Sequence, residues 1–169
     1  GHYARIQRGD DGRLHLMRLD PFDPPTEAIE SIAKVVREGG VIVYPTDTIY
    51  GLGCSPWNSM AVERIFAIKR RPERKGLLVL IPETSWLPDL CSGIPLGFES
   101  LAQDLWPGPV TFLLPASSRL PLLVRGDGNL VGVRDETCYM CGRRNPALWG
   151  YAPLLRTLGN DMGFVPLVV

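Results

Sequence analysis

The sequence predicts an α/β fold, because segments with helical periodicity alternate with short apolar runs that are typical of buried strands. Apolar residues recur at helical spacing over 27–38, and the runs 41–44 and 76–81 are continuously apolar. The sequence contains neither a Gly-x-Gly-x-x-Gly segment after a strand nor a Gly-x-x-x-x-Gly-Lys-Ser/Thr segment. It therefore does not predict a simple doubly wound nucleotide-binding fold.

Alternation and turn residues indicate the first elements. Residues 13–19 alternate in polarity, which favours a short edge strand, and 20–25 form a proline-rich linker. Thr26 is expected to cap the helix that follows, and the two glycines after that helix are expected to end it. The apolar run 41–44 then predicts a strand directly after the helix.

A second helix is expected from Ser59 to the residue before Pro72, with Val62, Ile65 and Phe66 on its inner face.

A third helix is expected over 95–105, with Leu101, Ala102 and Leu105 facing inward. The remaining expected elements are strands at 76–81, within 106–116, at 130–134 and at 164–169, and a helix at 151–159.

Length and charge limit the function classes. The chain has 169 residues, the size of one domain, and 18 Lys and Arg balance 18 Asp and Glu. The neutral net charge gives no general argument for nucleic-acid or membrane binding, so an anion site must come from local clustering. No apolar run approaches the ~18 residues of a membrane span, and no signal-peptide core is visible, so we expect a cytoplasmic protein.

The four cysteines are expected to be reduced thiols. Only Cys138 and Cys141 lie close together, as C-x-x-C, and a structural zinc site usually needs a second such pair. No metal site is therefore predicted, and scattered cysteines are typical of a reducing compartment.

A cluster of basic residues marks a possible anion site. Between Glu63 and Lys75, six basic residues against two acidic ones leave a net charge of +4. Cations at a helix C-terminus favour the helix dipole, which explains one or two of them as a solvated helix end. The cluster continues past Pro72 into a loop that leads to a buried strand, and loops at strand ends bind ligands in open sheets. Arginine and lysine side by side suit phosphate or carboxylate.

The strand at 41–44 runs into Pro-Thr-Asp-Thr, where Pro45 is expected to stop ladder pairing. Thr46 and Tyr50 would present hydroxyl groups, and the basic cluster lies at the other end of the same helix. A site built from both segments suits a small polar ligand next to a polyphosphate. No histidine accompanies the threonines, so acyl transfer by a triad is not predicted.

Four segments occur in series: YPTDTIYGLGC, IFAIKRRPERKGLLVLI, LWPGPVTFLLPA and VGVR. In order and spacing they resemble the YrdC-like family of threonylcarbamoyl-AMP synthases, over residues 27–134. The Arg-Pro-x-x-Lys-Gly version of the second segment is most similar to the bacterial single-domain members.

The resemblance implies a single α/β domain over 26–169, with a twisted, largely parallel or mixed sheet flanked by helices around a basic concave cavity. Residues 1–25 would form an N-terminal segment and linker. It implies that L-threonine, bicarbonate and ATP give threonylcarbamoyl-AMP and pyrophosphate, with Mg²⁺ accompanying ATP. The product would serve the N6-threonylcarbamoyl modification of adenosine 37 in tRNA, through a downstream threonylcarbamoyl transferase complex.

The resemblance also implies roles for individual residues. Lys69 and Arg71 match the family's K-x-R motif, assigned to catalysis and to the binding of ATP phosphates and carboxylates, and Lys75 falls near the phosphates. Arg70 and Arg74 are expected to be solvated. The implied substrate-binding positions have polar side chains that face the cavity: Thr46, Tyr50, Thr111 and Arg134.

After Arg134 the sequence departs from the family pattern. The family continues through a loop, a helix and a strand to a Ser-x-Asn motif, whereas residues 135–150 match nothing in that pattern. The sequence stops where the motif would begin, so 135–169 is expected to be divergent or truncated. Two interpretations are open. The chain is a weakened enzyme, or it is a relative that keeps the cavity for another function.

Two other functions are open. One is a YrdC-like RNA-binding module without synthase turnover, which would contact double-stranded RNA or tRNA through phosphates during tRNA or ribosome maturation. The other is carbamoyl transfer of the kind performed by related domains in hydrogenase maturation, which ranks last because those domains occur in larger chains. No membrane partner is expected.

Overall fold

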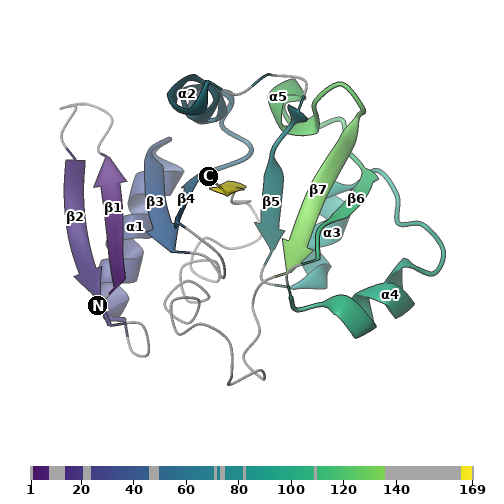
Figure 1. The fold of residues 1–169 in the computed structure, drawn as a ribbon, viewed down its shortest axis with the longest axis horizontal. Coiled ribbons are helices and arrows are strands. Elements are labelled where there is room, and N and C mark those ends of the chain that lie inside the picture. The colour runs from purple at the N-terminus through teal and green to yellow at the C-terminus, as the bar shows by residue number, and fades with distance from the viewer. Residues whose placement is uncertain are drawn as a thin grey trace.

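Two β-sheets and the helices around them make up the described part of the chain (Figure 1). The computed structural model describes residues 2–7, 14–20, 24–45, 50–70, 72, 75–81, 83–108, 110–135 and 165–168, with only the backbone of 2–7, 14, 45, 50 and 165–168. The helix expected at 151–159 and the Cys138–Cys141 pair lie outside these residues.

The first sheet has the strand order β2-β1-β3-β4-β8, and every neighbouring pair in it is antiparallel. Its strands are β1 (His2–Gln7), β2 (Leu14–Leu19), β3 (Val41–Pro45), β4 (Tyr50–Cys54) and β8 (Val165–Val168). The edge position of β2 and the extended β8 confirm the sequence predictions. The sequence did not predict β1 and β4. The chain before residue 26 thus contributes two strands to the sheet that contains β3.

The second sheet is mixed and has the order β5-β7-β6. Strands β5 (Leu78–Ile81) and β7 (Leu130–Asp135) are parallel, and β6 (Phe112–Pro115) is antiparallel to β7. Of the two expected alternatives, a largely parallel or a mixed arrangement, the mixed one is confirmed, because β5–β7 is the single parallel pair among the described strands. Short connections such as 46–49, between β3 and β4, permit only antiparallel pairing, since a parallel pair needs a long crossover.

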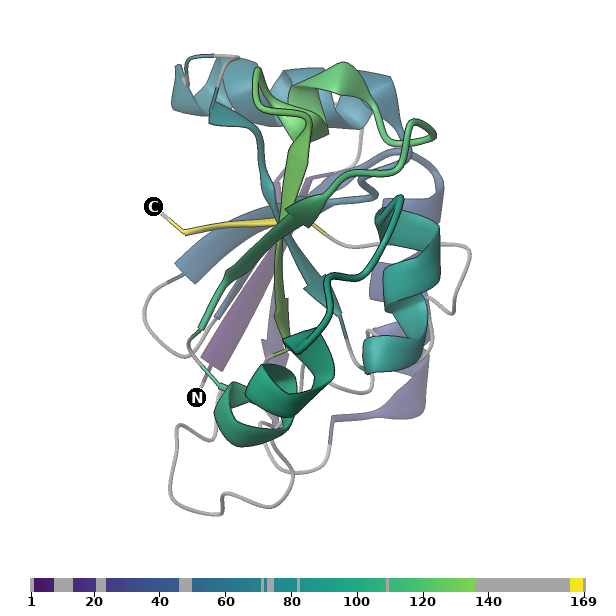
Figure 2. The same ribbon diagram turned by 90° about the vertical axis from the view of Figure 1, so that its right-hand side faces the viewer.

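Helices surround both sheets. In Figure 1, α1 lies behind the first sheet, and α2 and α5 lie above the upper ends of the strands. Figure 2 shows the same two helices at the top and α4 at the opposite end. The described helices are α1 (Thr26–Arg37), α2 (Ser59–Lys69), α3 (Leu87–Leu90), α4 (Phe98–Leu105) and α5 (Leu122–Arg125), with a 3₁₀ turn at Thr84–Trp86 before α3. Within the described ranges, no helix combines the length and the apolar character needed to cross a bilayer.

The start of α1 differs from the expectation. Pro25, not Thr26, occupies the N-cap position, and no side chain caps this helix. The backbone N–H groups of Ala28 and Ile29 donate instead to the carbonyl oxygen of Pro25, at 3.0 and 3.2 Å. Thr26 is the first helical residue, because its predecessor already has the extended backbone of a cap and supplies the first carbonyl.

Capping fixes both ends of α2. The side chain of Asn58 accepts a hydrogen bond of 3.0 Å from the backbone N–H of Ala61. At the other end, Arg70 adopts the left-handed conformation, with φ of 50°. The helix therefore ends at Lys69, before Pro72 is reached, and Arg70 is exposed as expected.

Two hydrophobic clusters hold the elements together. In the larger cluster, the predicted inner face of α2 (Val62, Ile65 and Phe66) packs with alternate residues of β5 and β7. In the other, apolar residues of α1 pack with Ile42 and Leu80. Because alternate residues of β5 enter different clusters, that strand is buried on both faces, as its apolar run predicted.

Helix α4 is less buried than its sequence predicts. It begins at Phe98, three residues later than expected, and packs inward through Phe98 and Ala102. The side chains of Leu101 and Leu105 are 53% and 41% exposed. The inward orientation predicted for these two leucines is wrong, because the short helix meets the core through a narrower stripe than the apolar residues occupy.

Candidate functional site

Two of the predicted site residues, Thr111 and Arg134, lie at the end of the sheets where β7 finishes. In Figure 1 the arrows of β3, β5 and β7 point the same way. The connection 46–49 follows β3, so it begins at the same end as Arg134, the penultimate residue of β7. Crevices at the carboxyl ends of strands are the usual ligand sites of open α/β sheets.

Arg134 and Thr111 are in direct contact. The Nε–H of Arg134 donates a hydrogen bond of 3.2 Å to the hydroxyl oxygen of Thr111. Thr111 directly precedes β6, and the antiparallel pairing of β6 with β7 brings it beside Arg134 although the two are far apart in sequence. The contact fixes the plane of the guanidinium group, and the Thr111 hydroxyl can still donate its own proton.

Gly132 lies next to this pair on β7. Side chains alternate along a strand, so Gly132 and Arg134 share one face of β7, and Val131, Val133 and Asp135 share the other. A Cβ atom at Gly132 would lie 3.4 Å from the Cγ2 atom of Thr111. Sequence reasoning missed Gly132, although its i, i+2 spacing from Arg134 was the signal that could have identified it.

Strands β3 and β4, on either side of residues 46–49, pair as a hairpin. The register pairs Pro45 with Tyr50, so Pro45 does not stop the ladder as expected. Its missing N–H costs nothing in the ladder if that position faces away from the partner strand. Thr46 lies outside the described residues, and of Tyr50 only the backbone in β4 is described. Their placement in a threonine pocket stays a prediction.

The basic cluster is described only in part. Lys69 is the last residue of α2 and is half-buried, and Lys75 is exposed shortly before β5. Arg71 and Arg74 lie outside the described residues. Because Lys75 precedes β5, it lies at the opposite end of that strand from the edge where β7 finishes. Whether the cations and the Thr111–Arg134 pair line one cavity stays a prediction.

Gly76 determines how the chain leaves Lys75. Its φ is +58°, and a Cβ atom there would lie 2.8 Å from the carbonyl oxygen of Val124. The next residue, Leu77, donates its backbone N–H to that same carbonyl at 3.0 Å. Only glycine fits this approach to α5 without strain, so Gly76 fixes the path from the basic cluster into β5.

The cysteines of the described region are not nucleophiles. Cys54 and Cys91 are free and buried, as the expectation of reduced thiols requires. Burial raises the pKa of the Cys54 thiol to about 12, against a smaller lowering effect of Arg64, and burial raises the pKa of Cys91 to about 11. Both thiols are therefore protonated at neutral pH. In the part of the chain that the structure describes, no three His, Cys, Asp or Glu side chains gather to hold a metal ion.

The family model described as telomere recombination, which groups Sua5, YciO and YrdC, matches residues 34–138. This match covers more than half of the chain. The chain belongs to the Sua5–YciO–YrdC family. The resemblance inferred from the four sequence segments is thereby confirmed.

Members of the Sua5–YciO–YrdC family with known names are similar over most of the chain. The threonylcarbamoyl-AMP synthase of Pseudomonas paraeruginosa is 43% identical over 139 residues, which cover 78% of this chain and 69% of the relative. The threonylcarbamoyl-AMP synthase of Methylobacillus flagellatus is 44% identical over 136 residues, which cover 80% of this chain and 74% of the relative.

Solved structures of the family share the fold. E. coli YciO superposes with a TM-score of 0.71 at 27% identity, over 89% of this chain and 68% of that chain. P. abyssi Sua5 in complex with L-threonine superposes with a TM-score of 0.72 at 30% identity, over 86% of this chain and 39% of that chain. This chain therefore spans well under half of Sua5. T. kodakarensis HypF, at 15% identity and a TM-score of 0.64, shares the fold alone.

Proposed function

We propose that this chain makes threonylcarbamoyl-AMP from L-threonine, bicarbonate and ATP and releases pyrophosphate. The observation that carries the proposal is the 43% identity with a threonylcarbamoyl-AMP synthase over 139 residues. The product would be consumed by a tRNA-modifying threonylcarbamoyl transferase complex, in the N6-threonylcarbamoyl modification of adenosine 37.

The Thr111–Arg134 pair suits the carboxylate chemistry of this reaction. Threonine must first form an N-carboxylate with bicarbonate or CO₂, and that carboxylate then attacks the α-phosphate of ATP. Arg134 supplies a positive, planar donor, and the Thr111 hydroxyl supplies a second donor held beside it at 3.2 Å. Donors that are already oriented lose little freedom when they bind an anion, so they stabilise the developing charge efficiently.

The basic cluster suits the phosphates. Two anions must approach each other and pyrophosphate must leave, so positive charge is needed on both sides of the α-phosphate. In this proposal, Lys69 and Arg71 bind the phosphates and the attacking carboxylate, and Lys75 binds the phosphates. No covalent intermediate with the protein is required, which agrees with the protonated state of the buried thiols.

Mg²⁺ would enter with the nucleotide. The described members of the site are two lysines, a threonine and an arginine, with no carboxylate among them. Magnesium prefers oxygen ligands and commonly binds through substrate phosphates, so this set fits Mg·ATP as the substrate better than a metal ion held by the protein. The metal would supply charge neutralisation at the phosphates.

Thr46 and Tyr50 are proposed to line the threonine pocket. Support comes from the sequence, where Thr46 directly follows β3, and from Tyr50 as the first residue of β4, because both strand ends lie at the same end of the fold as the end of β7. P. abyssi Sua5, which shares this fold, was solved in complex with L-threonine.

The decisive experiment measures pyrophosphate release from ATP with and without L-threonine and bicarbonate. The proposal expects release only when all three substrates are present, and formation of threonylcarbamoyl-AMP in equal amount by mass spectrometry. Folded protein that binds ATP and threonine but releases no pyrophosphate would contradict the synthase function. Pyrophosphate release that does not depend on threonine would indicate that another molecule accepts the adenylyl group.

A further inference from the structure

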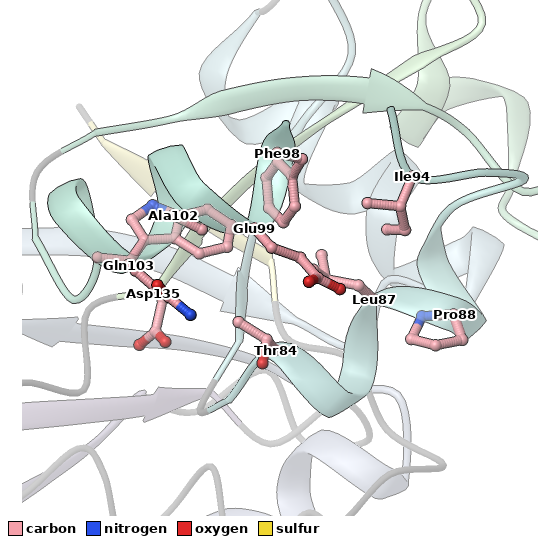
Figure 3. A pocket seen from close by; sticks show the side chains of 10 residues that line it. Thr84, Leu87, Pro88, Ile94, Phe98, Glu99, Ala102, Gln103 and Asp135 are labelled. Carbon is pink, nitrogen blue, oxygen red and sulfur yellow. The ribbon is translucent and has the colours of Figure 1, made fainter. Parts of the chain in front are cut away.

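A pocket lies on the other side of β7 from the Thr111–Arg134 pair. It has a volume of about 440 Å³ and lies between the α3 region and α4 (Figure 3). Asp135, 7% exposed, lines it at the end of β7. Because side chains alternate along a strand, Asp135 and Arg134 face opposite sides of the sheet. The pocket is therefore separate from the proposed synthase site.

Most of the pocket wall is apolar. Leu87 and Pro88 line it from α3, and Ile94 lines it from the connection between α3 and α4. Ala102 lies on α4, and Trp106 directly follows that helix. A concave apolar site with a few polar groups is the usual form of a binding pocket.

The charged groups of the pocket are all acidic. Glu99 and Asp135 line it, and Figure 3 shows the Glu99 side chain reaching from α4 toward Leu87. The surrounding segment 76–118 contains four acidic residues and no Lys, Arg or His, which gives a net charge of −4, and Arg119, directly after it, offsets one of these charges by pairing with Asp89 at 3.6 Å. A positively charged ligand is therefore favoured over an anion.

An apolar surface extends beyond the pocket. Ile94 lines it and is 40% exposed, and Leu96, two residues further on, is fully exposed. A small molecule could fill the pocket but would leave Leu96 in water, whereas a polypeptide could cover both. Exposed apolar groups beside an apolar pocket are typical of interaction surfaces.

We propose that the α3–α4 pocket and its rim (Ile94 and Leu96) bind a partner protein through a segment with an apolar side chain next to Lys or Arg. The apolar side chain enters the pocket between Leu87 and Ala102, and the cation lies beside Glu99. Neighbouring apolar side chains of the same segment cover the rim.

The test uses three synthetic peptides on the ¹⁵N-labelled full chain. The first is acetyl-Lys-Leu-Arg-Leu-Lys-amide, and its controls replace either the leucines by glycine or the basic residues by glutamate. The proposal expects saturable amide shifts over 84–106 with the first peptide at up to about 5 mM, which both controls fail to produce. Shifts confined to other regions, equal shifts with a control, or no shifts at all would overturn it.

Two substitutions sharpen the test. Glu99→Lys should weaken the first peptide about fivefold or more, while Glu27→Lys, on the exposed side of α1, should leave its affinity unchanged. Ile94→Ser should weaken binding without changing the fold, because this side chain is already part-exposed. Equal loss with Glu27→Lys would contradict the site. Sedimentation can be used to detect a dimer of the full chain. A dimer that Ile94→Ser abolishes would overturn the proposal, because this face would then bind a second copy of the chain and not a different protein.

Discussion

At the scale of single residues, the Thr111–Arg134 hydrogen bond offers a clean test of the proposed site. Thr111→Val keeps the shape of the side chain but removes the hydroxyl that accepts from Arg134 at 3.2 Å. We expect threonine-dependent pyrophosphate release to fall about 10- to 100-fold, because an oriented donor pair is lost. Thr111 is exposed, so the free energy of unfolding should change by no more than about 1 kcal/mol.

Steady-state kinetics and urea denaturation check this prediction together. Thr26→Val, in the exposed first turn of α1, is the matched control and should keep full activity. Wild-type turnover in Thr111→Val would show that the Thr111 hydroxyl takes no part in the reaction. A large loss of stability would instead mean that its role is structural.

The buried thiol of Cys54 predicts a pH dependence of stability. Its pKa is raised by burial from 9.0 in the unfolded chain to about 12 in the folded protein. The folded state therefore favours the protonated thiol, and this contribution is fully present below pH 9 and lost as the pH rises toward 12. We expect the wild-type urea midpoint to fall more between about pH 8 and about pH 10.5 than that of Cys54→Ala. Equal pH dependence of the two proteins would show that Cys54 remains neutral in the unfolded chain or ionises when folded.

At the scale of elements, Gly76 links the basic cluster to β5. Gly76→Ala would force alanine into a left-handed conformation and bring its Cβ within 2.8 Å of the Val124 carbonyl oxygen. We expect a loss of about 2–4 kcal/mol in the free energy of unfolding, from backbone strain and displacement of α5. Urea unfolding followed by circular dichroism measures it.

Gly128→Ala is the control for this substitution. A Cβ atom there meets only the side chain of Leu130, at 3.8 Å. Its stability should change by less than about 1 kcal/mol. If both alanine variants lose the same stability, the contact between Gly76 and α5 is not the cause.

The elements also show which parts of the fold could be predicted. The helix at 59–69 and the strand β5 were predicted because their apolar patterns reflect burial directly. Strand β4 was missed, because its two glycines weaken the strand signal and its partners Ile42 and Tyr44 lie across a turn. Burial of α4 was overestimated, since periodicity gives the direction of an apolar stripe but not the width of the surface that covers it.

The site was predictable to a lesser degree. The polar positions Thr111 and Arg134 came from the family resemblance, and their hydrogen bond depends on the β6–β7 register, which no local pattern specifies. Gly132 and Asp135 were missed, because glycine carries no chemical signal and the carboxylate belongs to a pocket formed by three separate segments.

At the scale of the whole molecule, charge is separated although the net charge is zero. Segment 63–75 carries +4 and segment 76–118 carries −4. An anion such as ATP should therefore respond to the local field and not to the net charge.

We expect the affinity for ATP to fall several-fold when the ionic strength rises from about 50 to about 500 mM, because the Debye length shortens. The affinity for L-threonine, which has no net charge, should change much less. Titration calorimetry at both salt concentrations measures the two affinities. An ATP affinity that does not depend on salt would argue against phosphate binding by Lys69 and Lys75.

The pairing of β4 has a consequence for how the protein is made. One neighbour of β4 is β3, directly before it, but the other is β8, and the paired residues Cys54 and Val165 are 111 positions apart (165 − 54). Because translation delivers the chain from its N-terminus, the far side of the hairpin lacks its partner until β8 leaves the ribosome. The hairpin next to the proposed threonine pocket is thus paired on both sides only after residues 165–168 have been made, and a nascent chain stalled before residue 165 would carry the hairpin with one open side.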